Sequence, residues 1–246
     1  MRVLKLFVLI VMNLLGLQVD NFLQKKELII NKYNNLAKLY NSRYDDKIHQ
    51  HEDLFLQFEL DATDTIDIGC GTGLGIKLMG EGASNYLGID ISPSMLDIAR
   101  KIYPDRKFTD KIDITTRKDF SEFKNFNQLI ALYGVPNYVG LENLFYYYTK
   151  YKMQYAVFIL YNLNYCPSYW YGEPNILNYY DSSQIKNLIT KYKIQEYFLD
   201  GFSYEKSQRL LNYSDFNNCE NICRRKYKLT KCKYLILTLG SIPDDI

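Results

Sequence analysis

The chain has 246 residues, of which 47% are hydrophobic and 24% charged, and its formal net charge is +2. A chain of this length buries about 70% of its unfolded surface, so it can form one complete α/β domain. The composition is that of an ordinary globular protein and excludes disordered and fibrous classes. The small net charge neither favours nor excludes an acidic partner.

The N-terminal segment from Val3 to Leu17 is almost entirely apolar. Its length of about 15 residues is short for a membrane span, which needs about 20. It is similar to the apolar core of a secretion signal, but no Ala-x-Ala site follows before Asp20. Three interpretations stay open: a signal or anchor, a helix packed on the domain, or translated sequence upstream of it. We expect residues 1–24 to be this leader and residues 25–246 to be the domain.

Helical spacing begins after the leader. Apolar residues recur from Lys25 to Asn41 at intervals that predict one helix, and a second helix is expected from Asp45 to about Leu60. Residues 25–60 therefore form a pair of N-terminal helices.

The most informative segment is a glycine loop that follows the apolar run Thr65–Ile68. A second apolar run, Tyr86–Ile89, ends at Asp90, which lies 21 positions after Gly69. This spacing predicts a strand, a tight loop, a helix and a second strand, with the carboxylate beside the loop. Because a carboxylate there can accept two hydrogen bonds from a ribose diol, the pattern indicates a site for an adenosine-type cofactor.

The register of the glycines decides the type of cofactor. A dinucleotide fingerprint needs a third glycine or alanine three residues after the second. Counting from Gly69 and Gly71 this position holds Leu74, and counting from Gly71 and Gly73 it holds Ile76. The register therefore excludes a dinucleotide site, and the sequence contains no Gly-x-x-x-x-Gly-Lys-Ser/Thr run, so a P-loop is excluded as well.

The pattern Asp67-x-Gly69-x-Gly71-x-Gly73 resembles motif I of the class I methyltransferases that use S-adenosylmethionine, and the segment 88–96 resembles their second motif. The resemblance extends more weakly from about residue 33 to the C-terminus. It implies an α/β fold: a Rossmann-like, seven-stranded, mainly parallel sheet with helices on both faces and an antiparallel last strand. It also implies that the N-terminal helices form a lid over the cofactor.

The resemblance assigns roles to individual residues. The glycines would line the methionine part of the cofactor, Asp67 would lie near its ammonium group, and Ile91 and Met95 would pack on the adenine. An acidic residue is expected after the third strand; Asp113 fits better than Asp110, because it follows the strand's last apolar residue. The predicted cofactor-binding residues are Asp67, Gly69, Cys70, Gly71, Gly73, Asp90, Ile91, Met95, Asp113, Leu132 and Tyr133.

Short apolar runs predict the other strands of a buried parallel sheet. We expect these strands at 107–112, 128–132, 154–161, 194–199 and 234–239. Helices are predicted at 74–79, 93–102, 141–150 and 183–192, the second of them with Ser92 as N-cap and Pro93 at its first position. The segment 202–231 is too long for a plain hairpin. We therefore expect an inserted helix or an excursion of the chain beside the final two strands.

The acceptor side is defined mainly by what it lacks. The loop after the fourth predicted strand, from Leu132 to Tyr138, is not the Asp/Asn-Pro-Pro-Tyr tetrad of base N-methyltransferases, and no Pro-Cys nucleophile for cytosine is present. The loop 164–174 carries the one tryptophan with three tyrosines, and such aromatic side chains stack flat ligands or cage cations. The candidate acceptor-binding residues are Tyr40, Tyr138, Trp170 and Tyr171.

No catalytic residue is assigned, because positioning alone supplies much of the rate of an in-line displacement, and no metal site is expected. The function predicted from the resemblance is methyl transfer from S-adenosylmethionine to oxygen or nitrogen of a small molecule. Two alternatives stay open. One is an RNA or protein methyltransferase that uses the basic segment 224–233; the other is a catalytically silent, cofactor-binding regulatory subunit.

The five cysteines are odd in number, and Cys70 lies inside the glycine loop, so no disulfide framework is expected. Cys219, Cys223 and Cys232 have neither a paired C-x-x-C spacing nor a nearby histidine, and we interpret them as ordinary thiols. Because a secreted enzyme would lack S-adenosylmethionine, we expect a cytoplasmic protein. Membrane association through residues 3–17 stays open.

Overall fold

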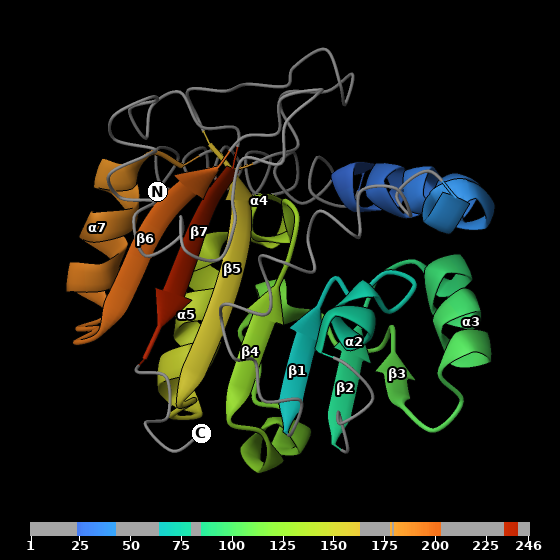
Figure 1. Cartoon of the computed structure of the whole chain (residues 1–246), viewed down its shortest axis with the longest axis horizontal. Coiled ribbons are helices and arrows are strands. Elements are labelled where there is room, and N and C mark those ends of the chain that lie inside the picture. Colours follow the sequence, from blue (N-terminus) through green and yellow to red (C-terminus); the bar gives the residue numbers. More distant parts are fainter. Residues whose placement is uncertain are drawn as a thin grey trace, which may run out of the picture.

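The computed structural model describes residues 24–42, 64–79, 85–162, 178, 180–202 and 234–240. Within these ranges the chain forms a seven-stranded sheet in the order β3-β2-β1-β4-β5-β7-β6 (Figure 1). The strands are β1 (Thr65–Ile68), β2 (Tyr86–Ile89), β3 (Lys107–Thr109), β4 (Gln128–Ala131), β5 (Tyr155–Tyr161), β6 (Tyr197–Phe202) and β7 (Tyr234–Leu239). Strand β7 pairs antiparallel with β5 and β6, and all the other pairs are parallel. The predicted fold class is confirmed.

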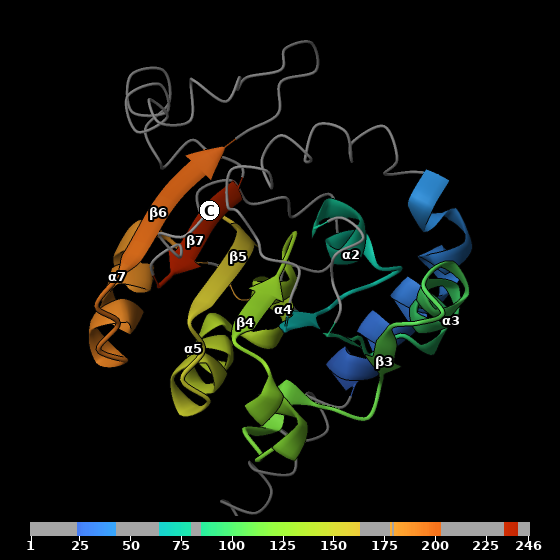
Figure 2. The same ribbon diagram turned by 60° about the horizontal axis from the view of Figure 1, so that its bottom comes forward.

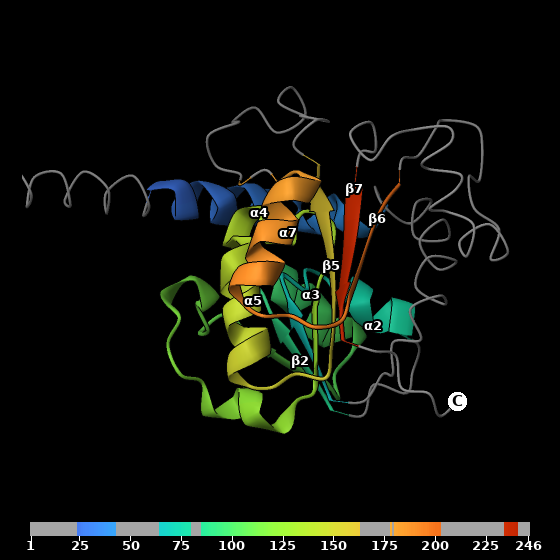
Figure 3. The ribbon, with the colours of Figure 1, turned by 90° about the vertical axis from the view of Figure 1, so that its left-hand side faces the viewer.

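Helices lie on both faces of this sheet. They are α2 (Leu74–Met79), α3 (Pro93–Ile102), α4 (Val135–Val139), α5 (Leu141–Lys150) and α7 (Ser182–Lys191), with two short 3₁₀ turns, η1 (Ile114–Thr116) and η2 (Ser121–Asn125). Figure 3 shows α5 and α7 on one face and α2 on the other. Residues 24–42 form a further helix, here called the N-terminal helix, which lies across the carboxyl ends of the parallel strands.

The central strands carry apolar side chains on both faces, and the helices on each side of the sheet bury them. Every residue of β1, β4 and β5 is buried, and Ile66, Leu129 and Phe158 are completely inaccessible to solvent. Each such side chain stabilises the fold by about 1.5–3 kcal/mol relative to an exposed one. The apolar runs in the sequence therefore correspond to the rigid centre from which the strand-end loops project.

Four strands differ from their predicted bounds. Strand β4 ends at Ala131 and β5 begins at Tyr155, each one residue shorter than predicted, and the other two differ more. Strand β3 ends at Thr109 and does not reach Ile112, because the Lys111 backbone N–H donates to the Thr109 hydroxyl (3.1 Å) and turns the chain. Strand β6 begins at Tyr197, three residues later than expected. The Ile194 backbone N–H still bonds to the carbonyl of Ile189 (3.0 Å) and so closes α7.

Helix α4 was predicted as part of a loop, because its five residues include Pro136 and are too few to show helical spacing. Other expectations fall outside the described residues: the leader, the helix at 45–60, the aromatic loop 164–174, the cysteines at 219, 223 and 232, and the excursion at 202–231 beyond its first residue. None of the helices in the described ranges is long and apolar enough to cross a membrane.

Asn137 on α4 joins the ends of separate elements and is completely buried. Its amide oxygen accepts from the Tyr161 backbone N–H (2.7 Å), and its amide nitrogen donates to the carbonyls of Tyr161 (3.2 Å) and Asn178 (2.6 Å). These bonds fix α4 against the end of β5 and against the chain at residue 178. Asn137 therefore shapes the edge of the sheet where α4 begins.

We expect Asn137→Ala to lower the free energy of unfolding by about 3 kcal/mol, because it leaves buried backbone groups without partners. Urea denaturation measures this change. Asn85→Ala is the matched control, since the Asn85 amide lies in more exposed surroundings and bonds to Asp64 and to the Asn125 carbonyl. Equal losses in the two variants would contradict the role assigned to Asn137.

Candidate functional site

A cavity of about 720 Å³ lies between the N-terminal helix and the carboxyl ends of β1 to β4. Its size is within the 300–1,000 Å³ range of small-molecule sites. The predicted residues that line it are Tyr40, Asp67, Gly69, Cys70, Gly71, Asp90, Ile91, Met95, Asp113, Leu132, Tyr133 and Tyr138. Gly73 does not line it, since a Cβ there would lie 2.6 Å from the Tyr103 ring. Trp170 and Tyr171 lie outside the described residues.

The glycine loop needs two of its glycines for different reasons. Gly69 and Gly71 both have left-handed backbones, with φ of 70° and 55°. A Cβ on Gly69 would lie 2.4 Å from Val135 Cγ2, so the side chain is excluded by α4. A Cβ on Gly71 would meet nothing within 4 Å, and this residue faces open cavity. A ligand can therefore approach the backbone of Gly71 closely.

The carboxylate of Asp90 is held beside this loop. One oxygen accepts from the Gly71 backbone N–H (2.9 Å) and the other from the Ser92 backbone N–H (2.8 Å). Burial raises the pKa of Asp90, and these N–H donors oppose that rise. A carboxylate accepts about four hydrogen bonds, so each oxygen keeps capacity for a hydroxyl donor. This geometry fits a ribose diol.

Asp67 is 2% exposed and lies against the start of α2. The Tyr86 hydroxyl donates to its carboxylate (2.7 Å), and a Cβ on Gly75 would lie 2.3 Å from the same oxygen. Burial raises the pKa of Asp67 to about 7; the Tyr86 hydrogen bond lowers it, and the charge of Asp90 adds to the rise. The first acidic residue of the motif is therefore a buried group that titrates near neutral pH.

This pKa predicts a stability that depends on pH. The carboxyl group titrates near 3.8 when unfolded and near 7 when folded, so between these values the folded protein binds more protons. Stability from this group is complete below pH 3.8 and falls as the pH rises through 7. We expect the wild type to lose about 2–3 kcal/mol relative to Asp67→Asn between pH 5 and pH 8 in urea denaturation.

The control for this experiment is Asp110→Asn, whose side chain is exposed on the surface. It should keep the wild-type pH profile. A constant difference between the wild type and Asp67→Asn across this range would show that the Asp67 carboxyl is already ionised at pH 5.

Of the two carboxylates after β3, Asp113 is among the described residues that line the cavity and Asp110 is not. Its carboxylate accepts from the backbone N–H (3.0 Å) and hydroxyl (2.6 Å) of Thr115 and from Lys26 Nζ (2.7 Å). Partial burial raises the pKa of Asp113, but the bonds from Lys26 and Thr115 outweigh it and hold the pKa below its ordinary value. Asp113 is therefore a fixed anion at one end of the cavity.

The N-terminal helix is bonded to each of the loops that follow β1, β2 and β3. Lys26 contacts Asp113, as described above. The Asn34 side-chain oxygen accepts from the Ser92 hydroxyl (2.7 Å), and the Asn41 side-chain oxygen accepts from the Thr72 hydroxyl (2.6 Å). Figure 2 shows the N-terminal helix close to α3. The helix thus covers the cavity through specific polar bonds as well as apolar packing.

We expect Asn34→Ala to increase amide hydrogen exchange in residues 24–42 by about tenfold. The substitution removes the acceptor for Ser92 Oγ and for the Ser94 backbone N–H (3.3 Å), each bond contributing about 0.5–1.5 kcal/mol. Asn35→Ala, one residue along on the exposed side of the helix, is the matched control and should change exchange less than twofold. Equal exchange in the two variants would disprove the anchoring role of Asn34.

The sequence analysis missed a further part of the cavity wall. It consists of Arg117, Glu142, Asn143, Asn178 and Tyr180, which come from the end of η1, the start of α5 and the chain before α7. No motif in the sequence marks these residues, because their proximity arises from tertiary contacts. Within the described ranges, no three His, Cys, Asp or Glu side chains are placed to hold a metal ion.

Comparison with known proteins agrees with this geometry. Residues 66–140 match the family described as a methyltransferase domain. A search of curated proteins gave no match to this chain. The family match covers the glycine loop, Asp90, Asp113 and the loop after β4.

Solved structures of similar fold include an S-adenosylmethionine-dependent methyltransferase from Archaeoglobus fulgidus, with 16% identity and a TM-score of 0.52 over 87% of this chain and 98% of that one. A Haloferax volcanii putative methyltransferase, in complex with the Trm112 methyltransferase activator, has 14% identity and a TM-score of 0.59 over 87% and 97%. A phosphoethanolamine N-methyltransferase from Haemonchus contortus, in complex with S-adenosyl-L-methionine, has 11% identity and a TM-score of 0.50 over 72% and 48%. The chain thus has the fold of these methyltransferases, and residues 66–140 match the methyltransferase-domain family.

Proposed function

We propose that this protein transfers a methyl group from S-adenosylmethionine to an oxygen or nitrogen atom of a small molecule. The observation that carries the proposal is the carboxylate of Asp90, held by the backbone N–H of Gly71 at the edge of a cavity, with open space beside that glycine. The cofactor seen in structures of similar fold has a ribose diol and a methionine chain, which match these two features.

The cavity wall offers a place for each part of this cofactor. Asp90 would accept from the ribose hydroxyls, Ile91 and Met95 would contact the adenine, and Asp113 would accept from its amine. The second carboxylate oxygen of Asp113 accepts one bond, from Lys26, and so retains capacity for another donor. The methionine part would lie along Gly69 and Gly71, where the backbone is accessible.

When bound, S-adenosylmethionine would supply an electrophilic methyl group: the acceptor's lone pair would take the methyl carbon, sulfur would leave as a neutral thioether, and the acceptor would release a proton. The residues of this chain would contribute by positioning, which can supply about 7–11 kcal/mol in favourable cases. Leu132 and Tyr133, at the end of β4, line the cavity together with Tyr40 and Tyr138. Their apolar surfaces would exclude water from the reacting atoms.

The shape of the site favours a small acceptor over RNA or protein. The N-terminal helix lies over the strand ends and is bonded to the loops after β1, β2 and β3, so an acceptor would share a covered cavity with the cofactor. The basic segment 224–233, on which the RNA alternative depends, lies outside the described residues.

The decisive experiment is incubation of the protein with methyl-labelled S-adenosylmethionine and fractionated metabolites, RNA and protein from the source cell. We expect the label in the metabolite fraction. Label in RNA or protein would establish the alternative substrate class. Binding of S-adenosylmethionine without transfer to any fraction would support a regulatory subunit.

Asp90→Ala should weaken the binding of S-adenosylhomocysteine at least tenfold in calorimetry. Each hydrogen bond to a charged acceptor contributes about 1.5–3 kcal/mol, and 1.4 kcal/mol corresponds to a factor of ten. Asp90→Asn keeps one acceptor oxygen and should lose less.

Asp110→Ala is the control and should bind nearly as the wild type does, whereas Asp113→Ala should be weaker. Thermal unfolding must be measured in parallel, because Asp90 also holds the glycine loop. A folded Asp90→Ala variant with wild-type affinity would show that the ribose assignment is wrong.

A further inference from the structure

We propose that Arg117 binds a carboxylate or phosphate group of the methyl acceptor. This inference rests on the proposed function and specifies its substrate class as an anionic small molecule. Arg117 lines the same cavity as the predicted cofactor residues, at the end formed by η1 and the start of α5.

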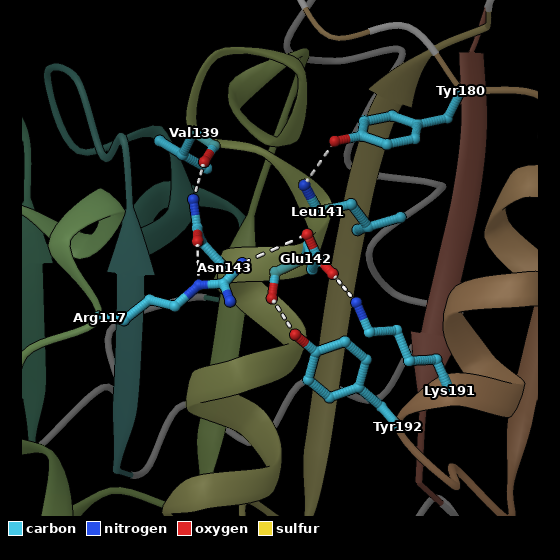
Figure 4. Close-up of polar contacts among 8 residues, drawn as sticks. All are labelled: Arg117, Val139, Leu141, Glu142, Asn143, Tyr180, Lys191 and Tyr192. Atoms are coloured by element: carbon cyan, nitrogen blue, oxygen red, sulfur yellow. Dashed lines mark hydrogen bonds and ion pairs between the residues drawn. The ribbon is translucent and has the colours of Figure 1, made fainter. Parts of the chain in front are cut away.

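The guanidinium of Arg117 is partly exposed (41%) and contacts Asn143 and Glu142 of α5 (Figure 4). Its Nε donates to the Asn143 side-chain oxygen (2.7 Å), and a terminal nitrogen lies 3.3 Å from the Glu142 carboxylate. Its central carbon lies 5.8 Å from the centre of the Tyr146 ring. A guanidinium has five N–H donors, and the Asn143 and Glu142 contacts use two of them. Three remain for a bidentate partner of the carboxylate or phosphate type.

The residue that orients Arg117 is itself held in place. The Asn143 amide nitrogen donates to the Val139 carbonyl (2.6 Å), and its backbone N–H donates to the Gly140 carbonyl (3.0 Å). The amide oxygen of Asn143 therefore points to Arg117. A preformed donor of this kind binds an anion at a smaller entropic cost than a mobile lysine does.

The backbone of Arg117 is in the left-handed region, with φ of 52°. This conformation is uncommon for a residue with a long side chain, and such residues are concentrated at ligand sites. It is imposed by the preceding turn, in which Asp113 caps η1 and the Arg117 backbone N–H bonds to the Ile114 carbonyl (3.4 Å). Arg117 is thus the left-handed C-cap of η1, and this turn brings the residue to the cavity wall.

Cationic side chains line the cavity on both sides of η1. Glu142 is shared between Arg117 and Lys191 (Figure 4), and a hydrogen bond from Lys191 holds the pKa of Glu142 below its ordinary value despite slight burial. Glu142 therefore stays ionised. Among the described lining residues near η1 and the N-terminal helix, the cations Lys25, Lys26 and Arg117 accompany the carboxylates of Asp113 and Glu142, and Lys191 outside the lining also bonds to Glu142.

A second donor faces the same compartment. The Tyr180 hydroxyl accepts from the Leu141 backbone N–H (2.8 Å), which leaves its own proton to donate. Burial raises the pKa of Tyr180, so the hydroxyl keeps this proton at neutral pH. The cavity that Arg117 lines therefore also contains a neutral donor for an acceptor molecule that extends beyond its anionic group.

The probes for this site are inorganic phosphate and acetate, titrated into the full chain with saturating S-adenosylhomocysteine. Binding is followed by calorimetry and by the Nε–Hε NMR signal of Arg117, assigned from its loss in Arg117→Lys. We expect at least one probe to shift this signal. Arg117→Gln should weaken that probe's affinity at least tenfold, and Arg117→Lys should weaken it less.

Two further variants separate binding from a structural tie between η1 and α5. Glu142→Gln removes the carboxylate that competes for Arg117 and should tighten anion binding several-fold. If Arg117 served only to hold η1 against α5, removing its partner Glu142 would not tighten anion binding. Arg100→Gln, an exposed arginine on α3 that does not line the cavity, should leave anion binding unchanged.

The proposal is overturned if Arg117→Gln binds both anions as the wild type does, if the wild type binds neither, or if Glu142→Gln weakens binding. S-adenosylhomocysteine affinity should stay within twofold in all variants, which verifies folding. Failure of the wild type to bind S-adenosylhomocysteine would count against the proposed function; the anion titrations, repeated without it, would still decide the role of Arg117.

Discussion

The hydrogen bond from the Gly71 backbone N–H to the Asp90 carboxylate joins the loop after β1 to the end of β2, and the site depends on it. The bond can form because β1 and β2 are adjacent and parallel, so that their carboxyl ends meet at one edge of the sheet. Gly71 makes this bond with a left-handed backbone (φ of 55°), a conformation that glycine adopts without steric cost. The same carboxylate then orients toward the cavity as an acceptor, so one interaction both closes the loop and creates a binding group.

The surroundings of Asp67 show that packing, as well as cofactor binding, restricts the residues of the glycine motif. Its carboxyl group is covered by α2, bonded to Tyr86, and approached so closely by Gly75 that a Cβ would collide with it. The spacing between Asp67 and Gly75 is therefore a packing requirement as well as a matter of cofactor chemistry. A cationic ligand group near Asp67 would favour its ionised form, which links ligand charge to the protonation of a buried residue.

Much of the fold was predictable because it depends on local patterns. The bounds of β1, β2, β7, α2, α3 and α5 follow from apolar runs and turn residues, and all were predicted correctly. The predicted start of β6 was wrong, because Ile194 is apolar yet closes the preceding helix.

In the site, the register of the glycines and the ends of the strands indicated Asp90 and Asp113. The bonds of Lys26 and Asn34 were not predictable, because they join residues 87 and 58 positions apart. Arg117 was missed for the same reason: its partner Asn143 lies 26 positions away on another element.

The two ends of the cavity are connected through one short turn. Asp113 caps η1 on the side of the predicted adenine site, and Arg117 ends the same turn beside α5. Lys26 of the N-terminal helix bonds to Asp113. This bond connects the helix to the predicted adenine site and to the turn that carries Arg117. Loosening of the helix would free Lys26 from Asp113 and remove one constraint on η1. The covering helix thus influences both the predicted cofactor residues and the cationic end of the cavity, and one element can order the two ligand sites together.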